Sequence, residues 1–384
     1  MDFEITDLRS RNFQPRLYGV GAWTDNLHFA YDLIATLRPH LFVELGTDRG
    51  ESYFAFCQST AENATGTRCV AIDSWRGDAH AGGYDETTRA EVAAHNRAHY
   101  ENFSRLLRTE FDDALTSFAD ESIDLLHLDG LHTEAAVRGD VENWLPKLRP
   151  RGLLLMHDVS VRGRGFGVWK VWEELKTRGR SYTFRDGPGL GVWQKPPPGK
   201  LCDPIETLLD GPSDRTTALE KYYREQAHGL QAKIAELWRA GSIRETAAGR
   251  QTTIQVFHSR DGKHREEDSV FARIGHESWK EISIALPTGA GVASLRIDFL
   301  SAFTTIEIAS LRVTSDSADL FAAADAAGFA QIRVAGDGER IPDSYHLRVR
   351  ITGIDPQLYL PALSAPEVNT SLRVEMRLRV SAPA

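Results

Sequence analysis

The sequence contains few cysteines, no long hydrophobic run and no excess of basic residues. Its three cysteines, Cys57, Cys69 and Cys202, form neither a disulfide framework nor a zinc-site spacing, so we expect them to be reduced, as in a cytoplasmic protein. No apolar run approaches the ~20 residues that span a bilayer, and the N-terminal residues lack the apolar core of a signal peptide. The net charge of −9 argues against a nucleic-acid-binding protein.

The length and composition indicate a soluble protein with more than one domain. A chain of 384 residues exceeds the size of one ordinary core, and 41% hydrophobic with 26% charged residues is typical of globular proteins. In the first half, strand-like apolar runs alternate with helical stretches, which predicts right-handed crossovers and a mainly parallel sheet in an α/β domain. The predicted strands are residues 40–46, 68–75, 104–111, 123–130 and 152–159.

The character of the sequence changes after this first half. Residues 181–195 resemble a closing hairpin, and the three prolines of 196–198 end the domain. Residues 203–241 have one apolar stripe at helical spacing, which fits either a connecting helix packed on a domain or a short oligomerising coiled coil. From about residue 246, short alternating runs predict an all-β, jelly-roll-like sandwich. The expected division is therefore 1–198, a helical linker at 199–244, and 245–384.

The first predicted strand leads into "VELGTDRGES", residues 43–52, which has the features of a ligand-binding turn. Gly46 and Gly50 allow close approach of a ligand to the backbone, and the helix N-terminus beyond them favours negative groups. The pattern E-x-G-x-x-x-G is not the G-x-G-x-x-G of dinucleotide-binding proteins. Glu44, just before the turn, suits a cationic or amine-bearing ligand such as the methionine moiety of S-adenosylmethionine.

Acidic residues also follow the next two predicted strands. Asp73 ends the second strand, where a carboxylate can accept hydrogen bonds from both ribose hydroxyls of a nucleoside. Asp112 or Asp113 follows the third strand and could meet an adenine amine. Each of these acids alone is equally consistent with an ordinary capping or turn residue. Three in order, at the carboxyl ends of successive strands, indicate a ligand site at that edge of the sheet.

Residues 40–195 resemble class I S-adenosylmethionine-dependent methyltransferases, and within them the macrocin- and mycinamicin-type sugar O-methyltransferases and cephalosporin-hydroxylase-like proteins. The resemblance rests on "VELGTDRGES", "AIDSWRGD", "LHLDGLHTEAAVRGDVENWLPKLRPRGLLLMHDV" and "GVWKVWEEL". It implies a Rossmann-like fold with S-adenosyl-L-methionine as cofactor. The expected cofactor-binding residues are Glu44, Gly46, Thr47, Gly50, Ser52, Asp73, Ser74, Asp112, Asp113 and Asp129.

The same resemblance implies a catalytic pair and a metal site. Asp129 matches an aspartate that binds a divalent ion, and His132 matches the general base. Asp158 matches the second carboxylate ligand, and His157 stands where macrocin-type enzymes have a further acid. Mg²⁺ prefers oxygen ligands whereas imidazole suits Mn²⁺ better, so Asp129, His157 and Asp158 form a candidate site for either ion.

Structural roles remain open for the same residues. His132 could be a helix cap or a surface residue, His157 could form a hydrogen bond inside the domain, and Asp158 could cap a turn. Residues 17–26 have the glycines and the Trp23 expected of a segment that folds over a cofactor. Arg162 and Arg164 could hold an anionic group of an acceptor or be solvated loop charges.

The sequence therefore predicts an O-methyltransferase that acts on a sugar hydroxyl, in the biosynthesis of a bacterial surface polysaccharide or a glycosylated metabolite. The alternatives are N-methylation, a small-molecule acceptor outside glycan pathways, or a catalytically degenerate glycan-binding scaffold. The expected partner is a sugar or glycan, with no nucleic acid and no membrane span. The C-terminal domain resembles β-sandwich modules found beside glycosyltransferases, which implies glycan binding or assembly. Residues 203–241 or this domain could form a homo-oligomer.

Overall fold

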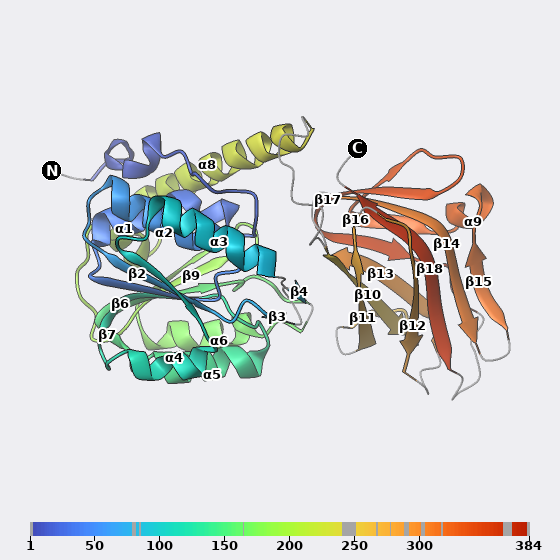
Figure 1. Cartoon of the computed structure of the whole chain (residues 1–384), viewed down its shortest axis with the longest axis horizontal. Coiled ribbons are helices and arrows are strands. Elements are labelled where there is room, and N and C mark those ends of the chain that lie inside the picture. Colours follow the sequence, from blue (N-terminus) through green and yellow to red (C-terminus); the bar gives the residue numbers. More distant parts are fainter. Residues whose placement is uncertain are drawn as a thin grey trace. The chain divides into compact units, whose positions relative to one another are not determined.

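The computed structural model divides into two compact units, residues 1–235 and 236–384 (Figure 1). No helix within the described part of the chain is long and apolar enough to cross a membrane. The structure describes residues 3–78, 82–83, 86–163, 165–239, 251–265, 268–276, 278–287, 292–300, 304–315, 318–363 and 371–381.

The first unit contains a seven-stranded sheet and the helices that cover it. Its α-helices are α1 (Leu27–Leu37), α2 (Glu51–Glu62), α3 (Glu86–His99), α4 (Phe111–Ala114), α5 (Glu134–Trp144), α6 (Val168–Leu175), α7 (Ile205–Leu209) and α8 (Asp214–Arg239). Its sheet strands are β1 (Leu41–Leu45), β2 (Arg68–Asp73), β5 (Ser104–Arg108), β6 (Ile123–Leu128), β7 (Leu148–His157), β8 (Ser181–Phe184) and β9 (Leu190–Gln194). Short 3₁₀ helices cover Ile5–Asp7, Arg9–Asn12, Thr24–Asn26, Leu115–Ser117 and Lys176–Arg178, and β3 (Gly77–Asp78) pairs with β4 (Gly82–Gly83).

The strand order of this sheet is β5-β2-β1-β6-β7-β9-β8. The first five strands pair in parallel, and β9 pairs antiparallel with both β7 and β8. The five predicted parallel strands and the closing hairpin are thus confirmed. The chain reverses its direction of winding after β5, when it returns to place β6 on the other side of β1, and the carboxyl ends of β1 and β6 meet at that switch, where open α/β sheets bind ligands.

Helices cover both faces of the sheet and make it the middle of three layers (Figure 1). The core on one face includes side chains from α1, α2 and α8, and the core on the other includes side chains from α4, α5 and α6. Strands β1 and β6 are buried along their whole length, as expected for a parallel sheet covered on both faces.

Helix α8, in the segment expected to be a linker, packs on the first unit. Leu219, Tyr223 and Leu230 are buried in the core that also contains α1 and α2. The hydroxyl of Tyr223 donates to the buried carboxylate of Asp32 at 3.1 Å, and the Ser10 hydroxyl donates to the same carboxylate at 2.6 Å. These contacts fit a helix packed on a domain, one of the two expected arrangements.

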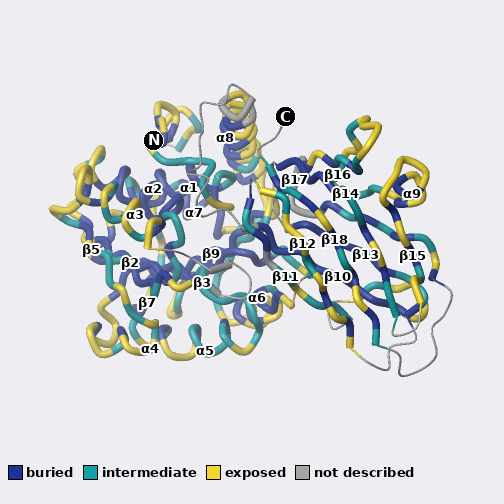
Figure 2. Tube along the Cα trace, turned by 45° about the vertical axis from the view of Figure 1, so that its right-hand side comes forward, coloured by how far each residue is buried: buried dark blue, intermediate teal, exposed yellow. Residues whose placement is uncertain are grey.

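From residue 251 on, the described residues of the second unit form β-strands and one short helix, α9 (Ala326–Ala330), which agrees with the predicted all-β class. One hydrogen-bonded path runs β11-β10-β13-β17-β14-β18-β12, with β15 added to β14 and β16 added to β17. One apolar core includes side chains from β10 and β13 and from β14 and β18, and Figure 2 shows buried and exposed residues alternating along these strands. The strands are β10 (Gln251–Ser259), β11 (Ser269–Gly275), β12 (Lys280–Leu286), β13 (Ser294–Leu300), β14 (Thr305–Ser315), β15 (Asp319–Ala323), β16 (Arg333–Ile341), β17 (Leu347–Tyr359) and β18 (Leu372–Ser381).

Candidate active site

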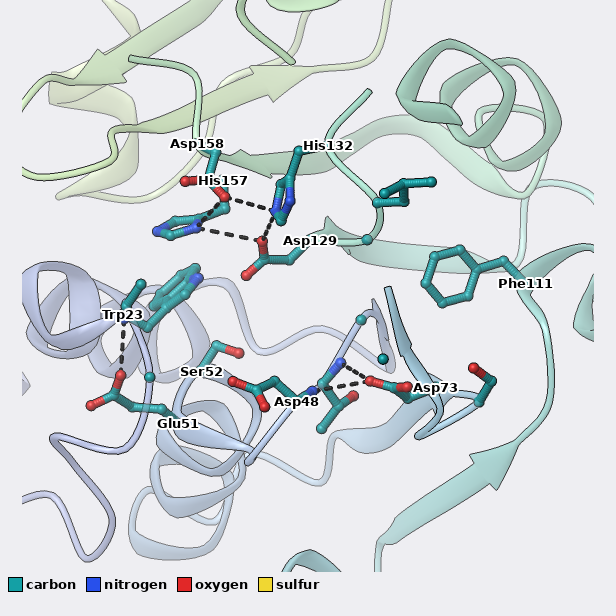
Figure 3. Close-up of a pocket in the computed structure, with 18 of the residues that line it drawn as sticks. Trp23, Asp48, Glu51, Ser52, Asp73, Phe111, Asp129, His132, His157 and Asp158 are labelled. Carbon is teal, nitrogen blue, oxygen red and sulfur yellow. Dashed lines mark hydrogen bonds and ion pairs between the residues drawn. The ribbon is translucent and has the colours of Figure 1, made fainter. Parts of the chain in front are cut away.

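A cavity of about 380 Å³ lies at the carboxyl ends of the parallel strands (Figure 3). Its walls come from the turns that follow β1, β2, β5, β6 and β7 and from the N-terminal segment. The lining residues are Gly21, Ala22, Trp23, Gly46, Thr47, Asp48, Glu51, Ser52, Asp73, Ser74, Gly77, Glu110, Phe111, Asp129, Gly130, Leu131, His132, His157 and Asp158.

The turn after β1 joins two walls of the cavity. Gly46 has φ +84°, which favours glycine, and a Cβ at this position would lie 2.0 Å from the carbonyl oxygen of Asp129. The backbone N–H of Asp129 in turn donates to Leu45 at 2.8 Å. Gly50, with φ +83°, then begins α2 as its N-cap. Glycine at position 46 therefore permits the close approach of the β1 and β6 turns.

Asp73, at the end of β2, fixes the conformation of this turn. Its Oδ2 accepts the backbone N–H groups of Thr47 at 2.8 Å and Asp48 at 3.0 Å. Its Oδ1 accepts the N–H of Trp75 at 2.7 Å. A carboxylate has about four acceptor positions, so one remains for a ligand. The structure thus leaves room for one ribose hydroxyl on Asp73, whereas the sequence suggested two.

Two aspartates and two histidines meet at the opposite wall (Figure 3). Nε2 of His132 lies 2.9 Å from Oδ2 of Asp158 and 3.6 Å from Oδ1 of Asp129. Nδ1 of His157 lies 3.4 Å from the same Asp129 oxygen and 3.3 Å from the same Asp158 oxygen. Asp158 has φ +61°, a left-handed conformation that is unusual outside glycine and typical of functional sites. The four side chains form one electrostatic cluster beside the cavity.

The charges of this cluster shift each other's pKa values. Burial acts to lower the pKa of His132, but hydrogen bonds and charge interactions with Asp129 and Asp158 outweigh it and raise that pKa to about 9. Burial acts to raise the pKa of both aspartates, but the imidazoles outweigh it and hold each carboxyl pKa well below its usual range. The pKa of His157 is raised by the same carboxylates against the effect of its burial. With no cation present, both histidines are therefore charged near neutral pH.

Neighbouring elements hold the His132 turn in place. The carbonyl of His132 accepts the N–H of Gly167 at 2.7 Å, and its ring stacks on Phe166 with centroids 4.4 Å apart. The Thr133 hydroxyl accepts the N–H of Ala136 and caps α5. His132 itself is therefore not the helix cap, a role the sequence left open.

The N-terminal segment 19–24 forms a further wall and is anchored by Glu51, the first residue of α2. The buried Glu51 carboxylate accepts N–H groups from Gly19 and Trp23 and the hydroxyl of Thr24 at 3.0 Å. The Trp23 ring stacks on His157 with centroids 5.5 Å apart. Trp23 thus connects this segment to the histidine–aspartate cluster.

Nine of the predicted site residues line this cavity. They are Gly46, Thr47, Ser52, Asp73, Ser74, Asp129, His132, His157 and Asp158. Glu44, Gly50, Asp112 and Asp113 are not among its lining residues.

Two placements differ from the expectation for physical reasons. Glu44 is fully buried, and its Oε2 lies 2.8 Å from Nδ1 of the equally buried His127, so Glu44 supports the floor of the site without reaching the cavity. Strand β5 ends at Arg108 rather than at residue 111. Phe111 therefore begins α4 and faces the cavity, while Asp112 and Asp113 are exposed on that helix.

Sequence patterns did not reveal several wall residues. Asp48, Glu51, Glu110 and Phe111 occupy ordinary turn or helix positions, and only the fold places them around the cavity. Arg162 lies over the ring of Trp169, 4.2 Å from its centroid. Arg164, the other arginine considered for an acceptor anion, lies outside the described residues.

Comparisons with known proteins find similarity in the first unit of the chain. Residues 43–159 match the family model of a methyltransferase domain. An uncharacterized protein of Sinorhizobium fredii, y4gI, is 47% identical over 200 residues, which are 51% of this chain and 22% of that relative. The chain thus spans about a fifth of that relative's length.

Solved structures with similar folds include two O-methyltransferases. The Bacillus cereus O-methyltransferase in complex with SAH is 16% identical, with a TM-score of 0.36, and the alignment covers 47% of this chain and 84% of that one. TomG from Streptomyces achromogenes, in complex with SAM, is 14% identical, with a TM-score of 0.35 and coverage of 47% and 83%. Residues 43–159, which match the methyltransferase model, contain the five parallel strands β1, β2, β5, β6 and β7 of the first unit, apart from the first two residues of β1.

Proposed function

We propose that this chain is an S-adenosylmethionine-dependent O-methyltransferase that acts on a sugar hydroxyl. The observation that carries the proposal is that one cavity combines two kinds of wall. One wall has the Gly46 turn and Asp73, which suit a nucleoside cofactor, and the other has an imidazole between carboxylates. The first wall suits binding of a methyl donor, and the second suits removal of a proton from a methyl acceptor.

The cofactor fits the wall formed by the turns after β1, β2 and β5. The remaining acceptor position of Asp73 takes a ribose hydroxyl, and Phe111 offers an aromatic face for adenine. Ser52 and Trp23 would hold its methionine end, and the cofactor would supply a methyl group to an acceptor bound at the wall that carries Asp129 and His132.

His132 is the proposed general base. His132 lines the cavity, and its Nε2 lies 2.9 Å from Asp158 and 3.6 Å from Asp129, so an acceptor hydroxyl would reach it by displacing one of these carboxylate contacts. The protein has to align the hydroxyl oxygen with the methyl carbon and sulfur and to accept one proton, because the sulfonium supplies the reactive group. An O-methyltransferase needs such a base since a sugar hydroxyl is a weak acid.

A general base must be neutral to accept a proton, but the carboxylates beside His132 favour its protonated form. A divalent cation on Asp129 and Asp158 would counteract their negative charge and lower the pKa of His132 from about 9 toward neutrality. Oδ1 of Asp129 and Oδ2 of Asp158 would hold this ion together with Nδ1 of His157, which lies 3.4 Å and 3.3 Å from these two oxygens, and Nε2 of His132 would stay unbound as the base. The mixed oxygen and nitrogen character of the three ligand atoms suits Mn²⁺ better than Mg²⁺. When bound, the ion would also lower the pKa of a coordinated hydroxyl.

A sugar is the acceptor best suited to this surface. The carboxylates and imidazoles, with the half-buried Gly130 beside them, provide several hydrogen-bond partners at the acceptor wall. These groups match a ligand with several hydroxyls better than an apolar phenol. The resemblance to sugar O-methyltransferases supports the same choice and places the reaction in the biosynthesis of a bacterial glycan or a glycosylated metabolite.

The proposal is tested by following transfer of a labelled methyl group from S-adenosylmethionine to a panel of nucleotide sugars and glycans, with EDTA, Mg²⁺ or Mn²⁺. We expect a base-stable methyl ether on a sugar, and loss of transfer in His132→Gln with retained affinity for S-adenosylhomocysteine. Transfer to an amine that survives the His132→Gln change would contradict O-methylation. Cofactor binding by the wild type without transfer to any acceptor would favour a degenerate scaffold.

A further inference from the structure

The second unit presents a group of aromatic and arginine side chains on the outer face of its sheet. Residues of β18 alternate between the core and this face, so Arg377 and Arg379 both point outward. Trp279 directly precedes β12. When the antiparallel pairing of β12 with β18 is extended by one residue, Trp279 lies opposite Arg379. The guanidinium carbons of Arg379 and Arg377 lie 5.3 Å and 5.5 Å from the centroid of the Trp279 ring.

The turn between β16 and β17 adds two more rings. The Asp343 side chain accepts the N–H groups of Tyr345 and His346, both at 2.8 Å, which fixes the turn. The His346 ring lies 5.2 Å from that of Trp279, and Tyr345 is 78% exposed. Trp279, Tyr345, His346, Arg377 and Arg379 are called the aromatic–arginine ledge below. A large aromatic side chain held outward by an ordered turn has a free face for a ligand.

The charges of the ledge are only partly neutralised. The carboxylate of Glu307 forms ion pairs with two arginines, Arg379 at 2.6 Å and Arg348 at 3.3 Å. Arg377 stands opposite Glu281 in the strand register, but within the described part of the chain it forms no ion pair. One guanidinium beside the rings is therefore free to bind an anion, in a chain whose net charge is −9.

We propose that the aromatic–arginine ledge binds an acidic sugar, a pyranose that carries a carboxylate. The C–H groups of a pyranose are slightly positive and pack on the negative face of an aromatic ring, here Tyr345. The guanidinium of Arg377 can bind the carboxylate through two parallel hydrogen bonds. Arg377 lies over Trp279, whose ring contacts His346, the sequence neighbour of Tyr345, so this group of side chains offers a guanidinium and aromatic rings for the two chemical features of one ligand.

The other basic residues on this face argue against nucleic acid as the ligand. Arg350 is paired with Glu339 at 3.5 Å and Arg312 with Asp319 at 2.8 Å. A nucleic-acid site requires a stripe of free cations along a phosphate backbone. Among the described residues of this face, Arg377 is the cation that lies beside the aromatic groups and forms no ion pair, which fits a compact anion.

The test is calorimetric titration of the full chain with tetragalacturonate, and with cellotetraose as a neutral sugar of equal length. We expect tetragalacturonate to bind about tenfold more tightly than cellotetraose, as one charge-assisted hydrogen-bond pair would give. Arg377→Gln and Tyr345→Ala should each weaken binding at least about fivefold. Arg373→Gln is the matched control, because Arg373 is an exposed residue of the same strand face, four positions from Arg377.

The proposal is overturned if tetragalacturonate does not bind, if cellotetraose binds equally well, or if Arg373→Gln has the same effect as Arg377→Gln. Tighter binding of decauridylate than of tetragalacturonate would assign the ledge to nucleic acid and also overturn it. Both test positions are exposed, so the variants should keep the melting temperature of the wild type. The readout involves no methyl transfer, so failure of the proposed methyltransferase activity would leave this result unaffected.

Discussion

Nε2 of His132 lies 2.9 Å from Oδ2 of Asp158, although strands β6 and β7 place the two residues in separate turns. This contact joins the proposed base to a carboxylate that modifies its charge. We predict that His132→Gln lowers the methyl-transfer rate at least about 100-fold, the usual loss when a general base is removed. Affinity for S-adenosylhomocysteine should stay within about twofold. An equal loss of rate and cofactor affinity would assign His132 to binding instead.

The raised pKa of His132 makes the stability of the metal-free protein depend on pH. Because the folded-state pKa is about 9 and the unfolded value is near 6.5, the stabilisation is complete below pH 6.5 and is lost as pH rises through 9. In EDTA, the free energy of unfolding should fall by about 2 kcal/mol more in the wild type than in His132→Gln between pH 6 and pH 9.5. Parallel curves for the two proteins would show that the carboxylates do not stabilise the imidazolium.

A bound cation should reverse that charge effect. We expect Mn²⁺ to raise the melting temperature of the wild type more than Mg²⁺ does, and to have little effect on Asp129→Asn or Asp158→Asn. Glu142→Gln, a change on the exposed surface of α5, serves as the control. Equal stabilisation of all four proteins by Mn²⁺ would place the ion elsewhere.

Asp73 should influence both stability and cofactor binding. Asp73→Ala removes the acceptor of three backbone N–H groups at the β1 and β2 turns, so we predict a loss of about 2 kcal/mol in the free energy of unfolding. Asp73→Asn keeps one acceptor oxygen and should lose less stability. Differential scanning calorimetry of both variants measures this order, and a larger loss in Asp73→Asn would contradict the assigned hydrogen bonds.

Glu51 should act on cofactor affinity through the N-terminal segment. In the wild type, the N–H groups of Gly19 and Trp23 and the hydroxyl of Thr24 donate to the Glu51 carboxylate. Glu51→Gln replaces this carboxylate by an amide, so segment 19–24 loses part of its anchor and Trp23 loses its fixed position against His157. We predict about tenfold weaker binding of S-adenosylhomocysteine. Unchanged affinity, with a lower melting temperature only, would limit Glu51 to a structural role.

The sequence predicted the parallel strands from local pattern, and nine of the 19 residues that line the cavity from that pattern together with the family resemblance. The acids at strand ends and Gly46 lie next to apolar runs, so their place at the sheet edge follows from chain direction alone. Asp129, His132 and Asp158 were expected to form one site because of the resemblance to sugar O-methyltransferases, and the adjacent parallel strands β6 and β7 bring them to one edge.

Contacts that join distant segments were not predictable from local pattern. Nothing near Glu51 indicates that its carboxylate binds residues 19–24. The point at which β5 ends, Arg108 and not residue 111, decides whether Phe111 or Asp112 faces the cavity. Strand β15, with the sequence DLFAA, was also missed. Alanine is a poor strand former, and pairing with β14 together with burial of Phe321 and Ala323 determines its conformation.

Calorimetric titration of the full chain with S-adenosylhomocysteine, in EDTA and then in Mn²⁺, tests the central claim most directly. The account predicts one site per chain in wild type, binding at least about tenfold weaker in Asp73→Ala, and unchanged binding in His132→Gln. Absence of binding to the wild type with or without the metal would contradict the assignment of this cavity to the methyl donor.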